Sequence, residues 1–168
     1  PDSHDICFIP SGNNAGWLRD RLGSENGPIV DEEGAVVGQH QGAYTYTIGQ
    51  RRGLNLSVPT EGGTPRYVLK IEPKTNTVVV GAKEALAISH INGEKAIWCG
   101  PQPESGKSYR GFAQVRAHGQ PLPCEYRTDG VSIVADLDEP LLGLAAGQGL
   151  VIYDGDRVVG SATVSATE

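Results

Sequence analysis

The chain has 168 residues, of which 38% are hydrophobic and 6% aromatic, and this composition supports one modest core or two small ones. Its formal net charge of −6 argues against a free-standing, nonspecific nucleic-acid binder, because phosphate neutralisation makes such proteins basic. No apolar run of about 18 residues and no signal-peptide pattern occurs, so we expect no contact with a membrane.

The first half of the chain predicts one short helix and two hairpins. The helix is expected over residues 13–22, with an asparagine at its N-cap and Gly23 at its end. Apolar runs on both sides of the turn at 31–34 predict the first hairpin. The alternating residues of 67–81, which turn at 73–76, predict the second.

The second half reads as short strands separated by turn signals such as Asp129-Gly130 and Asp154-Gly155. Six or seven strands at this spacing predict a closed or nearly closed β-barrel. The expected strands are 87–91, 95–99, 108–117, 124–128, 131–137, 149–153 and 158–164. The whole chain is therefore expected to be mainly β, with a lead segment over residues 1–26, a small central α+β or β domain over 27–86 and a C-terminal β-barrel over 87–168.

The cysteines indicate a reduced protein rather than a metal site. Cys7, Cys99 and Cys124 lie far apart, and no CxxC pattern occurs. No two histidines have metal-ligand spacing either, so we expect no metal site. Because the cysteines are expected to be reduced, we expect a cytoplasmic location. The chain has no methionine, even at position 1, and we interpret it as a fragment of a longer protein.

Cys7 has two interpretations. Its apolar neighbours in ICFI (6–9) favour a small apolar residue in a buried strand. A reactive thiol needs a lowered pKa, because the thiolate is the nucleophile, and Asp2 and Asp5 would raise that pKa. The N-terminus of the helix expected at Asn13 would act in the opposite direction.

Several basic groups are candidates for ligand contacts. Arg51 and Arg52 in YTIGQRRGL (46–54) either present guanidinium groups to phosphate or belong to an ordinary solvated loop. His40 either serves acid–base chemistry or ligand binding, or is a surface or hydrogen-bonded histidine. A third group on neighbouring expected strands either forms a basic stripe for RNA beside two tyrosines or is scattered surface charge: Arg110, Arg116 and Arg127, with Tyr109 and Tyr126.

Five stretches occur in a fixed order that carries a family resemblance. They are ICFI (6–9), GAVVGQHQG (34–42), YTIGQRRGL (46–54), YVLKIEPKTNTVVVG (67–81) and, after Gly147-Gln148, VIYDGDRVVG (151–160). Together they resemble the C-terminal part of the tRNA-specific 2-thiouridylases, which place sulfur on the wobble uridine of certain tRNAs. The resemblance covers essentially the whole chain.

The resemblance implies that part of the catalytic machinery lies outside this chain. The family has an N-terminal ATP-pyrophosphatase domain with a Gly-rich phosphate loop and a first catalytic cysteine. No such loop occurs here, so ATP is expected on that other domain and no cofactor on this chain. Residues 1–26 become the tail of the catalytic domain, and Cys7 becomes the persulfide carrier, which forms a disulfide with the first cysteine as sulfur is transferred to uridine C2.

The resemblance also implies tRNA contacts. Arg116 and Ala117 fall where the family's barrel has an arginine–aromatic pair that touches tRNA, and Ala117 can offer only its backbone. Gln148 matches a glutamine that contacts tRNA, although Ala146 stands where a proline is usual. With Arg51 and Arg52 these residues form the expected tRNA-binding set. A cysteine desulfurase or a sulfur-relay protein is the expected protein partner.

A rival reading keeps the barrel but not the chemistry. In that reading the chain is an RNA- or protein-binding β-barrel module in which Cys7 is structural. Either way, we expect the 168 residues alone neither to hydrolyse ATP nor to thiolate tRNA.

Overall fold

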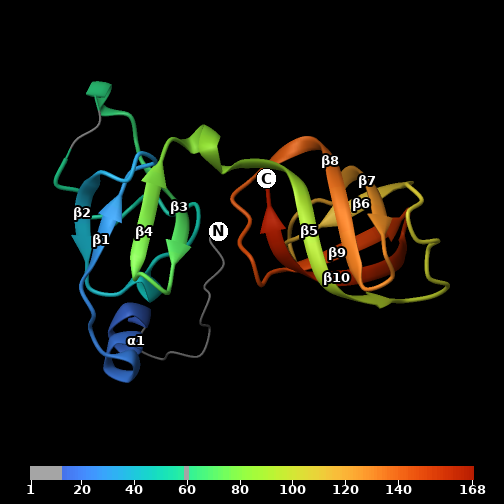
Figure 1. The fold of residues 1–168 in the computed structure, drawn as a ribbon, viewed down its shortest axis with the longest axis horizontal. Helices are drawn as coiled ribbons and strands as arrows, with labels where there is room; N and C mark the ends of the chain where they lie inside the picture. The colour runs from blue at the N-terminus through green and yellow to red at the C-terminus, as the bar shows by residue number, and fades with distance from the viewer. Residues whose placement is uncertain (1–12, 59–60) are drawn as a thin grey trace. The chain divides into compact units, whose positions relative to one another are not determined.

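A computed structural model describes residues 13–58 and 61–168 of the chain. The chain divides into two compact units, Pro1–Ala85 and Leu86–Glu168 (Figure 1). Each unit has an apolar core of its own among the described residues. Among the described residues, no helix is long and apolar enough to span a membrane. The expected fold class is confirmed: the chain is mainly β, with a small α+β unit followed by a closed barrel.

The first unit begins with the helix that the sequence predicts. Helix α1 covers Asn14–Leu22, and the Asn13 side chain caps it by accepting a hydrogen bond from the Gly16 N–H at 2.9 Å. Gly23 ends the helix with a positive φ of 79°, a conformation that glycine adopts without a steric cost.

Four strands form the sheet of the first unit, in the order β2-β1-β4-β3 (Figure 1). The strands are β1 (Gly27–Val30), β2 (Val36–His40), β3 (Tyr67–Glu72) and β4 (Thr77–Gly81). The two hairpins pair antiparallel, as expected, and β1 runs parallel to β4 in the middle of the sheet. Three short 3-10 helices cover Ala43–Thr45, Glu61–Gly63 and Lys83–Leu86.

Buried side chains from both hairpins fill the core of this unit. Ile29, Val68 and Val78 are fully buried, and Leu54 joins them from the loop after β2. Backbone hydrogen bonds hold that loop to the sheet. One of them runs from the Gly49 N–H to the Val68 carbonyl at 2.8 Å. Residues 46–54 therefore follow the sheet without forming a strand.

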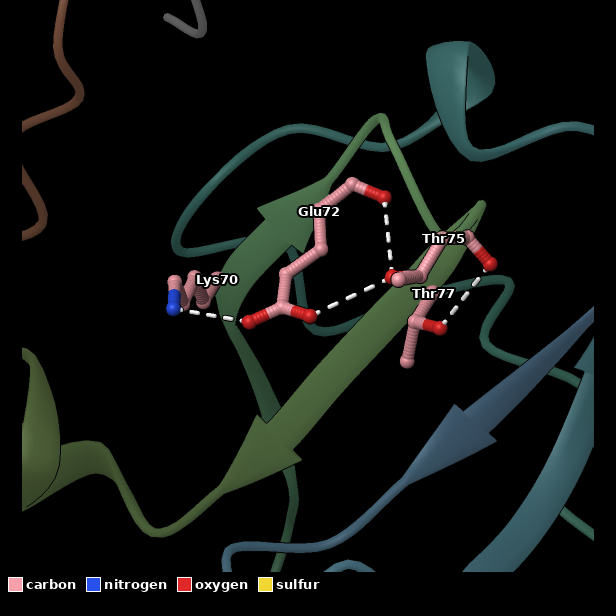
Figure 2. A network of polar contacts seen from close by, with 4 residues as sticks. All are labelled: Lys70, Glu72, Thr75 and Thr77. Atoms are coloured by element: carbon pink, nitrogen blue, oxygen red, sulfur yellow. Dashed lines mark hydrogen bonds and ion pairs between the residues drawn. The ribbon is translucent and has the colours of Figure 1, made fainter.

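Polar side chains stabilise the turn between β3 and β4. Lys70 donates to a carboxylate oxygen of Glu72 at 2.7 Å, and Thr75 donates to the other carboxylate oxygen at 3.2 Å (Figure 2). Thr77 donates to the Thr75 carbonyl at 3.2 Å. The hydrogen bond from Lys70 is the main reason why the pKa of Glu72 lies below its usual range.

The second unit is a closed antiparallel barrel in the order β10-β5-β8-β7-β6-β9 (Figure 1). Alternate residues of each strand point inward, and Ile91, Ile133, Leu150 and Ile152 are fully buried at its centre. The strands are β5 (Ala87–Trp98), β6 (Tyr109–Gln114), β7 (Leu122–Thr128), β8 (Ser132–Leu142), β9 (Gly149–Asp154) and β10 (Arg157–Thr167).

One strand differs from the sequence-based expectation. The segments expected as separate strands at 87–91 and 95–99 form the single strand β5. The pairing of β5 with β10 shifts register opposite Lys95, which has a positive φ of 57°. A bulge at Lys95 therefore bends one long strand, where the sequence suggested a turn between two.

Candidate functional site

The candidate residues divide between the two units. Cys7 lies outside the described residues. Arg51 and Arg52 belong to the first unit, whereas Arg116, Ala117 and Gln148 belong to the barrel.

Arg51 and Arg52 sit on a braced loop. The Gln50 side chain accepts a hydrogen bond from the Thr47 N–H at 3.1 Å and donates to the Arg52 carbonyl at 2.9 Å. The Val68 N–H in turn donates to the Gln50 carbonyl at 2.9 Å. Both arginines are exposed, and neither guanidinium bonds to another described residue. The backbone is thus fixed while the two charges remain available to an anion.

Arg116 is exposed on the barrel unit, and hydrogen bonds within that unit hold its side chain in place. Its Nη2 donates to the carbonyls of Leu142 at 2.9 Å and Gly143 at 2.6 Å, at the start of the loop between β8 and β9. The Gly119 N–H donates to the Arg116 carbonyl at 2.9 Å, which closes a tight turn in the loop between β6 and β7. Arg116 therefore connects two neighbouring loops. Ala117 is exposed beside it.

Gln148 ends the loop whose start Arg116 contacts. Its carbonyl accepts a hydrogen bond from the Val164 N–H at 2.8 Å, and the Gly147 N–H donates to the Val164 carbonyl at 2.7 Å. These two bonds fix the backbone against β10, while residue 148 remains exposed. The structure thus places Arg116, Ala117 and Gln148 on two loops of one barrel, joined by the arginine.

The basic stripe considered from the sequence does not form. Arg110 makes a two-pronged ion pair with Asp138, at 2.9 and 2.5 Å, and Arg127 pairs with Asp136 at 3.0 Å. The Arg110 guanidinium holds the pKa of Asp138 below its usual range. The carboxylates of β8 therefore neutralise both arginines, a consequence of strand register that the sequence alone does not reveal.

The two tyrosines beside that stripe are also unsuited to stacking on bases. Tyr109 and Tyr126 stack on each other, with ring centroids 5.6 Å apart. Tyr126 faces the barrel core and is only 4% exposed, and this burial raises its pKa. The aromatic pair is therefore part of the packing of the barrel.

His40 is more enclosed than the sequence indicates. It is 4% exposed, and its Nδ1 accepts a hydrogen bond from the Gly42 N–H at 3.0 Å. Burial lowers its pKa, with a smaller opposing effect from the Asn76 carbonyl. A neutral ring that accepts at Nδ1 carries its proton on Nε2. That Nε2 is buried and has no hydrogen-bond partner among the described residues.

A polar pocket of about 580 Å³ opens beside His40 in the first unit. Its lining combines one guanidinium with several amides and the ring of Tyr46, whose centroid lies 5.5 Å from that of His40. Residues that line it include Arg19, Asn26, Gln39, Gln41 and Asn55. The sequence reasoning missed this pocket, because its residues come from separate segments; the polar letters around His40 in GQHQG were its only signal.

The two described cysteines differ sharply in exposure. Cys99 is exposed, whereas Cys124 is fully buried in the barrel. Burial raises the pKa of Cys124 from 9.0 to about 11, so its thiol stays protonated near neutral pH and is a poor nucleophile. Among the described residues, no group of three or more His, Cys, Asp or Glu side chains is arranged to hold a metal ion.

Two family models match the chain, one on each unit. The model described as the tRNA methyl transferase PRC-barrel domain matches residues 15–82. The model described as the aminomethyltransferase beta-barrel domain matches residues 88–164.

Curated bacterial relatives named tRNA-specific 2-thiouridylase MnmA are about half identical to the chain. The identity is 51% over 168 residues in Cutibacterium acnes, 50% over 165 in Leifsonia xyli subsp. xyli and 52% over 170 in Thermobifida fusca. These matches cover 100%, 98% and 99% of the chain but 45% of each relative. The chain thus spans less than half the length of these proteins.

Proposed function

Because the chain belongs to the tRNA-specific 2-thiouridylase family and matches the C-terminal region of its members, we propose that it serves the ATP-dependent transfer of sulfur to C2 of the wobble uridine in tRNA. The observation that carries this proposal is an identity of about half over the whole chain, since it spans both units. The chain supplies the sulfur carrier and part of the tRNA contact, while ATP binds to a domain outside these 168 residues.

Cys7 is the proposed sulfur carrier. A cysteine desulfurase or a sulfur-relay protein loads it as a persulfide, Cys7–S–SH. ATP supplies the adenylyl group that makes the uridine 2-oxygen a leaving group. The terminal persulfide sulfur then bonds to C2 as AMP leaves. A second cysteine, outside the chain, attacks the Cys7 sulfur; the S–S bond breaks, its electron pair stays on the thiouridine sulfur, and a cysteine disulfide forms that an external thiol must reduce.

The barrel and the first unit are proposed to hold the tRNA. Arg116 has Nη1 and Nε unoccupied while its Nη2 bonds to the two carbonyls, so it can offer charge to a phosphate from a fixed position. Gln148 and the Ala117 backbone lie on the two loops that it joins. Arg51 and Arg52 add two exposed charges on the first unit. Such local contacts are compatible with a net charge of −6, because the remaining positive potential can come from the rest of the protein.

Loading of Cys7 is tested by intact mass. The chain is incubated with a cysteine desulfurase and cysteine, and the mass gain of one sulfur atom is sought in the wild type and in Cys7→Ala. Sulfur on the wild type alone supports the proposed carrier. A folded chain that gains no sulfur favours instead the RNA- or protein-binding barrel in which Cys7 is structural.

The tRNA contact is tested by binding of unmodified tRNA to the chain. We expect Arg116→Glu and Gln148→Ala to weaken binding, each by about tenfold, since each removes a charged or polar contact. Arg157→Glu is the control matched in charge to Arg116→Glu, because Arg157 is an exposed barrel arginine that pairs with Asp154. Unchanged affinity in both loop variants contradicts a role for the barrel loops. The chain alone is expected to thiolate no tRNA, and turnover by it would contradict the assignment of ATP to another domain.

A further inference from the structure

The pocket beside His40 is built from side chains that the fold leaves unoccupied. Its amides from Asn26, Gln39, Gln41 and Asn55 make no side-chain hydrogen bond to any described residue, and neither does the Arg19 guanidinium. All five are exposed at its walls. The volume of about 580 Å³ lies within the range of ligand sites, roughly 300–1,000 Å³. The pocket therefore has room for a ligand and free polar groups to contact it.

The His40 ring lines this pocket, and its buried Nε2 is a hydrogen-bond donor without a partner among the described residues. His40 Nε2 carries the proton of the neutral ring, and it finds no acceptor among the described residues. The Asn76 carbonyl acts on the ring but does not complete a hydrogen bond to Nε2. A buried donor without an acceptor is unfavourable, so a small movement of the ring toward an acceptor on a bound ligand would be stabilising.

The chemistry of the lining narrows the class of ligand. Each free amide offers both donors and an acceptor, the pattern with which asparagine and glutamine read the edges of nucleobases. Arg19 adds one positive charge suited to a phosphate, and Tyr46 adds an aromatic ring. None of the described residues that line the pocket carries a carboxylate that would repel an anion. A group with an aromatic polar edge and one phosphate matches all of these features.

We propose that this pocket binds a single nucleotide, with its base against the amides and His40 and its phosphate toward Arg19. The nucleotide comes either from a single-stranded stretch of RNA or from a free nucleoside monophosphate. In the first case the inference rests on the proposed function, because the first unit then reads an unpaired nucleotide of the tRNA while the barrel loops hold another part of it.

The test titrates the 168-residue chain with each of the four nucleoside 5′-monophosphates and with a single-stranded RNA hexamer. Backbone and imidazole NMR signals are followed. We expect shifts at residues 39–41 and 53–55 and at His40 Nε2–H. Arg19→Glu and Gln41→Glu should each weaken binding by about tenfold, since each puts a negative charge beside the phosphate or base. Arg21→Glu is the matched control, because Arg21 lies on the same helix but stacks on Trp17, 4.4 Å from its ring centroid.

The outcomes separate the two sources and the two proposals. Binding of the hexamer alone identifies an RNA strand as the source, and equal binding of a monophosphate identifies the free nucleotide. No shift with any probe, or shifts that survive in Arg19→Glu and Gln41→Glu, overturns the inference. If the pocket variants keep tRNA binding while Arg116→Glu and Gln148→Ala lose it, this inference fails and the proposed function stands.

Discussion

At the scale of single residues, burial of the Cys124 thiol makes the stability of the barrel depend on pH. The raised pKa of Cys124, about 11 against an ordinary 9.0, means that the unfolded chain loses this proton first. The stabilisation is therefore complete below pH 9 and is lost as the pH rises from 9 to 11. The loss amounts to about 2 kcal/mol.

Removing the thiol should flatten this dependence. We expect the free energy of unfolding of Cys124→Ala to fall less steeply between pH 9 and 11 than that of the wild type, as measured by urea denaturation. Cys99→Ala is the matched control for the loss of a cysteine, because Cys99 is exposed. Parallel curves for Cys124→Ala and the wild type would contradict the burial effect.

Lys95 carries local backbone strain in the barrel. Its φ of 57° lies in the left-handed region, in the middle of β5, where a residue with a Cβ costs about 1 kcal/mol more than glycine. Lys95→Gly should leave the stability unchanged or raise it by up to about 1 kcal/mol. Glu94→Gly, next to it in the same exposed strand but without a positive φ, should lower the stability by a similar amount.

Fluorescence of Trp98, at the end of β5, reports the unfolding of this strand in denaturant. The prediction fails if both glycine variants are destabilised equally, since the bulge would then impose no special conformation on residue 95.

At the scale of elements, the turn between β3 and β4 is tied to distant parts of the first unit through Asn76. Its side chain accepts a hydrogen bond from the Ala43 N–H at 3.2 Å and donates to the Glu25 carbonyl at 3.0 Å. Its φ of 49° is a second requirement, and asparagine tolerates it better than most residues. One residue thus joins the hairpin to the segments before β1 and after β2.

Two substitutions separate these contributions. Asn76→Gly keeps the backbone conformation but removes both side-chain bonds, and Asn76→Ala removes the bonds and adds strain. We expect losses of about 1–2 kcal/mol for Asn76→Gly and about 1 kcal/mol more for Asn76→Ala in urea denaturation. Thr75→Ala, at the same turn but with bonds only within it, should cost less. A glycine variant as stable as the wild type would show that only the φ matters.

Sequence patterns predicted an element correctly where all the residues that determine it lie close together in the chain. The Asn13 cap and Gly23 bound α1 as expected, and the alternation in 67–81 gave the second hairpin. The parallel pairing of β1 with β4 joins segments almost fifty residues apart in the sequence. Pairings between such distant segments are the hardest to predict from a single sequence. The bulge at Lys95 was read as a turn for a related reason: its backbone conformation depends on the partner strand β10.

The same distinction applies to the candidate site. The side chains proposed to contact tRNA are exposed, as such contacts require: Arg51, Arg52, Arg116 and Gln148. The sequence could not show, however, that Arg116 donates hydrogen bonds to the Leu142 and Gly143 carbonyls. Nor could it show the pairing of arginines with aspartates across β6, β7 and β8, because such pairs follow from register. The pocket beside His40 likewise exists only after α1, β2 and the loop after it are folded together.

At the scale of the whole molecule, the two units differ in how much apolar surface they bury. Among the described residues, the core of the first unit contains seven buried apolar side chains and that of the barrel fourteen. A small core leaves a domain marginally stable, so the first unit is expected to unfold at the lower temperature. Each unit holds one tryptophan, Trp17 in the first and Trp98 in the barrel, and these report the two transitions separately.

Glycine variants in each unit test whether the transitions are independent. An alanine Cβ at Gly27 would collide with the Asn76 carbonyl and lie 2.6 Å from the His40 ring, and one at Gly111 would lie 2.6 Å from the Tyr153 carbonyl. Each clash involves backbone that cannot move freely, so each variant should lose about 2 kcal/mol or more of the free energy of unfolding of its own unit.

Gly27→Ala should lower the temperature of only the Trp17 transition in a thermal melt, and Gly111→Ala that of only the Trp98 transition. Gly100→Ala controls for the substitution itself, because Gly100, like Gly27 and Gly111, has no positive φ and an added Cβ there meets no atom within 4 Å. Coincident shifts of both tryptophan signals in either clashing variant would show instead that the two cores unfold as one cooperative unit.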